Sequence, residues 1–370
     1  MLRSRRLILG TFAIASLALL AFACDGDDEA AVPTPTATQV ASAAPGPATF
    51  EVTAGAAEGA FDIEQFMPAT VRVRTGDTVH WRGSGHEGHT ITFIPPEMTL
   101  SDVVPGGYLL PAPDQPEALE FNQNVTLSSA AQGTYDGAAY TNSGIFGVPA
   151  EGEYSLSFPE EGVYPYLCMI HPFHMRGVVV VDAADAAVSA PEAVVAQGDR
   201  DRERYVEEAR VAAETMERER LAASDVTANG RSWEVGVGVD TPHAQVLTFM
   251  PASLDIDTGD TVVFWNSERD FHNVVFTPEG QDPPPFPIIK PVEGRDGFRL
   301  LINPDAQRET PPPAGFGPDD FFSSGMMGIT LPRLYYEVTF TQPGTYRYAC
   351  TIHALAGMAG VVDVNPPEGR

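Results

Sequence analysis

Cysteine is scarce in this chain. Only Cys24, Cys168 and Cys350 occur among its 370 residues. This count excludes a small domain held together by several disulfides. Cys168 and Cys350 could in principle bond to each other, but each begins a similar stretch that continues through a His to a Met. That repetition favours the same chemistry in two places over one bridge.

Basic residues are also few. The chain has 22 Lys and Arg residues against 50 Asp and Glu, which gives a net charge of −28. A nucleic-acid partner is therefore excluded, because its phosphates would be repelled. Such acidity suits a protein that meets redox protein partners, including cationic ones, and it also serves solubility alone.

Long apolar runs are missing beyond the N-terminus, and no later stretch is long enough to span a bilayer. At the start, three arginines precede the apolar stretch 7–23, which is typical of an export signal. The sequence LAFAC at 20–24 resembles a lipoprotein processing box, so residues 1–24 are predicted to be a signal peptide with a lipobox. Ordinary cleavage after the Ala-Phe-Ala site at 21–23 is the alternative.

Cysteine usage bears on this choice. If Cys168 and Cys350 hold metal, Cys24 has no partner, and a lipid on Cys24 would remove an exposed free thiol. We therefore expect an exported protein anchored to the outer face of the cytoplasmic membrane, or a periplasmic or secreted one if the signal is simply cleaved. Residues 25–48 are acidic and then rich in Ala, Pro and Thr, which predicts a disordered tether.

One pattern occurs twice, 183 residues apart. FMPATVRVRTGDTV begins at Phe66, and FMPASLDIDTGDTV begins at Phe249. Repetition at a fixed offset indicates duplicated structure, so we expect a first domain at 49–182 and a second at 227–370. Between them, residues 183–226 show apolar residues at helical spacing in a run of Arg and Glu, which predicts a helix of roughly 25 residues. We expect this helical linker to lie as a spacer on one domain; a partner-docking helix is the alternative.

Within each copy the pattern is that of strands. Residues 71–74 and 78–81 alternate between apolar and polar around a Thr-Gly-Asp turn, and the second copy repeats this. The 34 Gly and 33 Pro residues favour short strands and turns over long helices. The expected fold class is all-β, with an antiparallel sandwich or barrel in each domain.

Each copy carries a His in its middle and ends in a Cys, a His and a Met. We call His171 and His353, which follow the cysteines by three residues, the closing histidines. Two imidazoles and a thiolate with a weak thioether are the donors of a blue-copper site. The predicted ligands are His89, Cys168, His171 and Met175 in the first copy, and His272, Cys350, His353 and Met358 in the second.

The second copy reads VVFWNSERDFHNVVF up to its first ligand His, and closes with Cys350-x2-His353-x4-Met358-x-Gly360. With these motifs both halves resemble cupredoxins of the plastocyanin/azurin family. The resemblance implies two tandem Greek-key β-sandwiches, one type 1 copper in each, and one-electron transfer. It also implies that each closing histidine reaches the surface through an apolar patch, where electrons enter or leave.

The first copy departs from this pattern. Only three residues separate His171 from Met175, and one of them is His174, which is the alternative axial ligand. Asn266 stands where the family has an Asn beside the copper loop, which steadies the site by hydrogen bonds, and Gly83 takes that place in the first copy. We therefore expect the two coppers to differ in potential.

Multicopper oxidases and copper nitrite reductases are the enzymes built from such domains. They place a His directly beside the ligand Cys and use His-x-His pairs to hold a second centre. Here Leu167 and Met169 flank Cys168, Ala349 and Thr351 flank Cys350, and no His-x-His occurs among eight histidines. The sequence thus favours an electron carrier over an enzyme. The alternatives are a copper storage or delivery protein, and a first domain that serves as scaffold while the second holds a single copper.

Overall fold

A computed structural model describes residues 46–367, with gaps at 84, 128–132, 148–151, 223, 228–229, 267–269, 279–280, 282–288, 295–296, 303, 305–307 and 329–332. The expected signal, its Cys24 and nearly all of the expected tether lie outside the described residues. None of the helices in the described part is long and apolar enough to cross a bilayer.

Strands dominate the first half, as the alternating pattern predicts. They are β1 Thr49–Glu58, β2 Phe61–Met67, β3 Thr70–Arg74, β4 Thr78–Gly83, β5 Thr92–Phe93, β6 Leu109–Ala112, β7 Gln115–Phe121, β8 Gly133–Thr134, β9 Thr141–Asn142, β10 Gly152–Ser157, β11 Gly162–Leu167 and β12 Arg176–Asp182. Two one-turn helices, α1 Leu100–Val103 and α2 Gln123–Thr126, lie between the first ligand His and the Cys.

The second half repeats this order after a long helix, α3 Pro191–Ala222. Its strands are β13 Ser224–Thr227, β14 Gly230–Asp240, β15 Ala244–Met250, β16 Ser253–Asp257, β17 Thr261–Trp265, β18 Val275–Thr277, β19 Ile289–Gly294, β20 Gly297–Ile302, β21 Phe322–Ser323, β22 Tyr335–Thr339, β23 Gly344–Ala349 and β24 Ala359–Asn365. A 3-10 turn, Ala354–Ala356, lies inside the loop before β24.

Each half is a sandwich of two sheets, so the predicted fold class is confirmed. In the first half, β3-β12-β11-β5-β9 form one layer and β2-β1-β4-β10-β8 the other; the second half pairs β16-β24-β23-β18-β21 with β15-β14-β17-β22. Buried aromatic side chains from both layers meet in the core. Phe50 and Trp81 of one sheet and Phe93 and Tyr166 of the other belong to a single cluster.

The two halves share one sheet, because β2 pairs with β15 in antiparallel register. The partners are Asp62 with Gln245, Ile63 with Ala244, and Phe61 with Val246. Asp62 and Gln245 occupy equivalent positions of the repeat, so the two copies meet through equivalent positions of their equivalent strands, β2 and β15. The result is a ten-stranded sheet that continues from one sandwich into the other.

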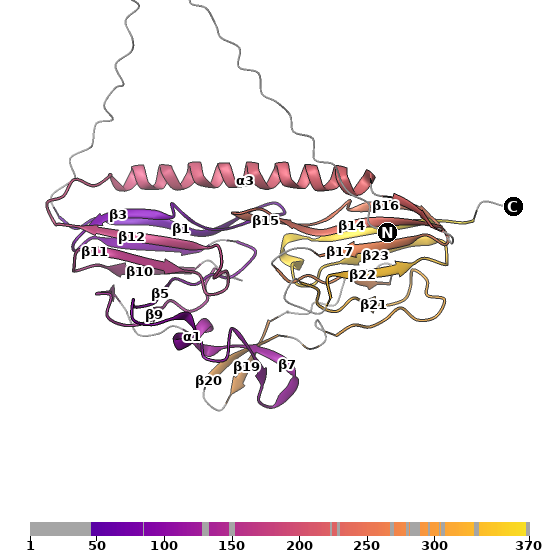
Figure 1. Cartoon of the computed structure of the whole chain (residues 1–370), viewed down its shortest axis with the longest axis horizontal. Coiled ribbons are helices and arrows are strands. Elements are labelled where there is room, and N and C mark those ends of the chain that lie inside the picture. The colour runs from indigo at the N-terminus through magenta and orange to yellow at the C-terminus, as the bar shows by residue number, and fades with distance from the viewer. Residues whose placement is uncertain are drawn as a thin grey trace, which may run out of the picture. The chain divides into compact units, whose positions relative to one another are not determined.

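Helix α3 packs on both halves rather than on one, so this part of the linker prediction is wrong. It contacts β1 and β2 as well as β14 and β15, and Figure 1 shows it running along these strands. Tyr205 and Ala209 of its apolar face are buried with Ile63 and Val246 from the shared sheet. At Gly198 an added Cβ would lie 2.7 Å from the Met67 carbonyl oxygen, so glycine lets the helix approach β2 closely.

The segments inserted between the first ligand His and the Cys of each copy also join the halves. Strands β6 and β7 of one insertion and β19 and β20 of the other form a four-stranded sheet. Leu301 of β20 pairs with Glu120 of β7. Arg299 donates hydrogen bonds to Glu120 at 2.9 Å and to Asp114 at 3.0 Å, and these ion pairs fasten the two insertions together.

Candidate metal centres

Three of the four predicted ligands of each copy come from one short loop between the last two strands. In the first half, the backbone N–H of Cys168 donates to the Met175 carbonyl at 3.0 Å. In the second, Cys350 donates to Met358 at 2.9 Å. These backbone hydrogen bonds continue the β-ladder across the mouth of each loop, so the Cys and Met positions are fixed by the flanking strands.

The remaining ligand of each copy comes from an earlier segment that is also backbone-paired. His89 exchanges two hydrogen bonds of 2.9 Å with Phe146, and His272 exchanges bonds of 3.0 and 2.8 Å with Met327. Each imidazole is therefore held by the sandwich rather than by the loop. The predicted ligands of each copy therefore come from two parts of the chain that the fold brings together.

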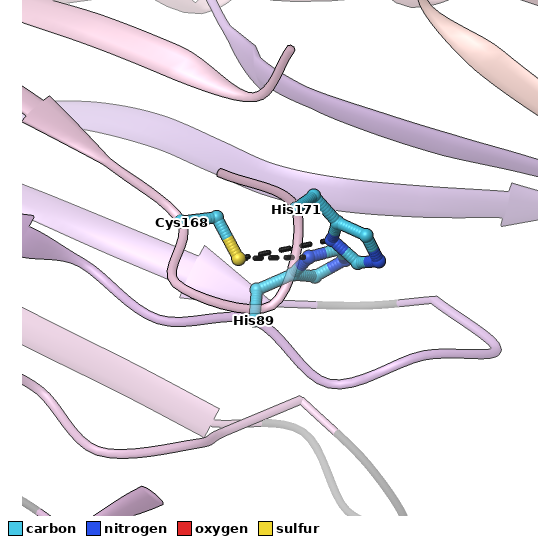
Figure 2. A group of neighbouring side chains, drawn as sticks. All are labelled: His89, Cys168 and His171. Carbon is cyan, nitrogen blue, oxygen red and sulfur yellow. Dashed lines mark hydrogen bonds between the residues drawn. The ribbon is translucent and has the colours of Figure 1, made fainter. Parts of the chain in front are cut away.

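The structure brings His89, Cys168 and His171 of the predicted first centre together. The Cys168 Sγ lies 3.9 Å from His89 Nδ1 and 3.7 Å from His171 Nδ1, and Figure 2 shows the sulfur pointing at both rings. The backbone N–H of Thr90 donates to the sulfur at 3.4 Å. Met175 is buried in the same apolar cluster as Cys168.

The second centre has the same construction. The Cys350 Sγ lies 3.8 Å from His272 Nδ1 and 3.6 Å from His353 Nδ1, and the two Nδ1 atoms are 3.1 Å apart. Met358 is buried in one cluster with Cys350. The structure thus brings the predicted His and Cys residues together in two groups of three, and it buries Met175 and Met358 in the core beside them.

The charge states of both cysteines and of His272 suit metal binding. Burial raises the pKa of the Cys168 thiol, but the hydrogen bonds and charges of His171 and His89 outweigh it and hold that pKa well below its usual value. The pKa of Cys350 is lowered against its own burial by His353. Burial and the charge of His353 lower the pKa of His272 to about 3, which keeps this imidazole neutral. A thiolate and a neutral imidazole are the forms that bind metal.

The far nitrogens of the closing histidines meet carboxylates instead of solvent. His171 Nε2 lies 2.7 Å from Glu87 Oε2 and 3.6 Å from Glu64 Oε1. His353 Nε2 lies 3.0 Å from Glu87 Oε1 and 3.1 Å from Asp270 Oδ2. The two rings are only 7% and 3% exposed. The expectation that the closing histidines reach the surface is therefore wrong, because the shared sheet brings the two loops together around these acids.

His174 is tied to the same acids. Its Nε2 makes a short hydrogen bond to Glu64, which is fully buried on β2. The ring centroid of His174 lies 5.7 Å from that of His171. The extra histidine of the first copy, His174, is therefore hydrogen-bonded to Glu64 through its Nε2.

The amide that steadies the second loop belongs to Asn273, which sequence reasoning missed. Asn273 Oδ1 accepts from the Thr351 N–H at 2.8 Å, and its Nδ2 donates to Thr351 Oγ1 at 2.8 Å. Asn266, which was expected to steady the site, donates to the Met327 carbonyl at 2.8 Å and so supports the segment that pairs with His272.

In the first copy Thr90 takes the place of Asn273 and holds the loop by a side-chain hydrogen bond. Its Oγ1 accepts from the backbone N–H of Met169 at 2.7 Å, and Gly83 has no part in this contact. Both residues directly follow the first ligand His of their copy, and that shared position was the signal available in the sequence.

Two interlocked β-sandwiches, each with a thiolate between two imidazoles and a buried thioether, define a cupredoxin-type copper protein. The sequence profile of copper binding proteins of the plastocyanin/azurin family matches residues 50–182 and 327–365. Plastocyanin of Vicia faba is 30% identical over 119 residues, which cover 32% of this chain and 89% of that protein. The chain belongs to the plastocyanin/azurin family.

Other relatives give similar figures. Plastocyanin of Sambucus nigra is 29% identical over 119 residues, 32% of this chain and 89% of that protein. Against the chloroplastic plastocyanin of Pisum sativum, 30% identical, the match covers 32% of this chain and about half, 52%, of the relative. Among solved structures, auracyanin B is 28% identical with a TM-score of 0.25, covering 36% of this chain and 88% of that one.

The residues of both sets fit copper. Thiolate and imidazole with a weak axial thioether are the ligands of blue-copper sites. In each set the His nitrogens and the Cys sulfur lie within 4.8 Å of one another. The first set depends on one glycine, Gly55, which has φ +73° at a β-bulge of β1. A Cβ added there would lie 2.0 Å from His89 Nε2.

We expect Gly55→Ala to destroy the first centre alone, because the methyl group displaces the His89 ring. Bound copper should fall from two ions to one per chain, measured by metal analysis after loading. Gly59→Ala is the matched control, since Gly59 has φ +63° with nothing within 4 Å of its added Cβ. Two coppers in Gly55→Ala, or equal losses in both variants, would contradict the assignment.

Proposed function

We propose that this chain is an electron carrier that holds one type 1 copper in each half and passes single electrons between redox partners outside the cytoplasm. The observation that carries this proposal is the pair of buried donor sets. Copper, when bound, supplies the one-electron chemistry. The proposed ligands are His89, Cys168, His171 and Met175, with His272, Cys350, His353 and Met358.

The frame of each site supports electron transfer. Both loops are closed by a backbone hydrogen bond between Cys and Met, and a side chain of the preceding segment, Thr90 or Asn273, fastens each loop from within. Ligands held by strands on both sides have little freedom to move when the metal changes its charge. A small movement keeps the reorganisation that accompanies electron transfer small.

The neighbours of the ligand cysteines favour a carrier over an oxidase or nitrite reductase. Those enzymes connect a type 1 copper to a second centre through a His beside the Cys, whereas this chain has Leu167 and Met169 beside Cys168 and Ala349 and Thr351 beside Cys350. Copper storage or delivery would be better served by open sites rich in Met and His. Here the ligand side chains are buried, with 7% exposure at most.

Because the closing histidines are buried, electrons must enter and leave by another part of each loop. One large apolar side chain projects from each loop two residues after that histidine: Phe173 is 81% exposed and Leu355 is 67% exposed. The chain carries a net charge of −28. We infer a redox protein partner with a basic docking face that covers these apolar tips, since opposite charge speeds encounter and apolar contact holds the complex.

Replacing the tips tests this route. Phe173→Ser and Leu355→Ser should each slow electron exchange with a cationic cytochrome by roughly tenfold, the effect of losing about 1.4 kcal/mol of contact. Stopped-flow rates at two salt concentrations would show it. Val163→Ser, which removes an equally apolar side chain that is 67% exposed on β11, should leave the rates unchanged. Loss of rate in the control, or in none of the three, would exclude docking at the loops.

Copper content and the visible spectrum of the full chain test the function itself. We expect two coppers and an intense thiolate-to-copper charge-transfer band that falls by half in Cys168→Ser and by half in Cys350→Ser. One copper, with all colour lost in Cys350→Ser, would make the first half a scaffold. Ready loss of copper to a weak chelator would favour delivery, and no blue colour with Cu(II) would exclude electron transfer.

Redox titration should resolve two potentials; a single overlapping wave would contradict unequal sites.

The location proposed rests on the N-terminus. Residues 1–24 have the pattern of an export signal, and a lipid on Cys24 would hold the protein on the outer face of the cytoplasmic membrane by the tether 25–48. Cys24→Ala should release the protein from membranes into the periplasm or medium, as judged by fractionation. A wild-type chain that never joins the membrane fraction would indicate plain cleavage instead.

A further inference from the structure

We propose that Glu87 is a shared carboxylate that holds the closing histidines of both copper sites and joins the two coppers into one coupled redox unit. This inference rests on the proposed function, because it requires a copper in each half. It concerns a residue that neither copper binds. It also assigns a direct path for electrons between the two centres inside the chain.

Glu87 lies in the segment between β4 and β5, two residues before the ligand His89. Asp270 stands at the same place before His272, so the repeat supplies an acid at both positions. Of these two acids Glu87 alone touches both centres: its Oε2 is 2.7 Å from His171 Nε2 and its Oε1 is 3.0 Å from His353 Nε2. Asp270 reaches His353 alone among the closing histidines, at 3.1 Å.

The hydrogen bonds to Glu87 fix the form of both rings. A carboxylate accepts hydrogen bonds, so the Nε2 of each closing histidine carries the proton that it donates to Glu87. Nδ1 is then the nitrogen left to face a metal, and it lies 3.7 Å from the Cys168 sulfur in one centre and 3.6 Å from the Cys350 sulfur in the other. A carboxylate behind a metal-binding His orients the ring and raises its basicity. Here one carboxylate does so for two metals.

Sharing makes the two sites depend on each other. When one copper is oxidised, its imidazole becomes more positive and draws the Glu87 charge towards itself. The hydrogen bond to the other imidazole weakens, so that the second copper loses part of its support for the oxidised state. The two oxidations are therefore anticooperative, and each site should have a lower potential when the other site is empty or reduced.

The same contacts provide a path. From one closing histidine to the other, the chain of atoms runs through a hydrogen bond, a single carboxyl group and a second hydrogen bond. An electron that leaves Cu(I) at one centre reduces Cu(II) at the other, so one ion is oxidised and one reduced. No bond forms or breaks, and both Nε2 protons stay on their rings.

Asp270 gives the matched control. It is 21% exposed in its side chain against 16% for Glu87, it occupies the equivalent position, and it contacts only the second centre. Glu87→Gln removes the charge and leaves one accepting oxygen for two donors, whereas Asp270→Asn does the same for one. Glu161→Gln, an exposed carboxyl between β10 and β11, controls for the loss of one charge.

The experiment measures copper affinity, potential and electron exchange in the full chain. We expect Glu87→Gln to weaken copper binding ten- to a hundredfold at both centres, read separately in Cys168→Ser and Cys350→Ser backgrounds, while Asp270→Asn weakens only the second. Both potentials should rise in Glu87→Gln and one in Asp270→Asn. In the two-copper protein, the exchange rate between centres after pulse reduction should drop about tenfold in Glu87→Gln alone.

A readout without copper accompanies these. In the metal-free chain, the Nε2–H proton resonances of His171 and His353 should both shift in Glu87→Gln, and only that of His353 in Asp270→Asn. If the wild-type chain is blue with two coppers but Glu87→Gln changes one centre or neither, the shared carboxylate is wrong and the carrier function stands. A wild-type chain that binds no copper would overturn the function itself, and the proton resonances would still report the bridge.

Discussion

Strands β2 and β15 pair through three residues on each side, and this pairing decides what surrounds the copper loops. Along β2 the side chains alternate: Ile63 is buried against Tyr205 of α3, while Asp62 and Glu64 on either side of it are buried towards the other face. Glu64 meets His171 and His174 there. A sandwich that stood alone would expose this edge to solvent, so the burial of the closing histidines is a property of the joined halves.

Four acids, Asp62, Glu64, Glu87 and Asp270, thus lie in and around the space between the centres. Burial and the charges of Glu87 and Glu64 raise the pKa of Asp62 well above its usual value. Burial also raises the pKa of Glu87, but hydrogen bonds from His171 and His353 outweigh it and hold that pKa well below its usual range. A buried carboxylate is costly unless a cation or donor compensates it. The closing histidines His171 and His353 provide that compensation, so the shared acid and the loops of both halves stabilise each other.

The sequence was sufficient for the sandwiches and for the two groups of His and Cys that the fold brings together, because these depend on spacing within each copy. Cys350, His353 and Met358 share one loop, and the fixed offset of the repeat locates their counterparts. It was insufficient for contacts between the copies, since strand alternation does not say which edge strands will pair. For the same reason the position of α3 across both halves, the burial of the closing histidines and the role of Glu87 were not found. Asn266 does support the segment that pairs with His272, as expected of it, but Asn273, which holds the loop itself, was missed.

The duplication is most informative where its symmetry fails. Glu87 and Asp270 are equivalent, but Glu87 has one more methylene and spans the two centres, whereas Asp270 serves only its own. Asn273 holds its loop by two hydrogen bonds to Thr351, and Thr90 holds the other loop by one to Met169. Predicted ligands of the same type therefore sit in unequal hydrogen-bond environments, and such outer contacts tune a bound metal. Under the proposed function, two similar sites that share one carboxylate would store two electrons and release them at different potentials, which two separate copies of a single-domain carrier would not do.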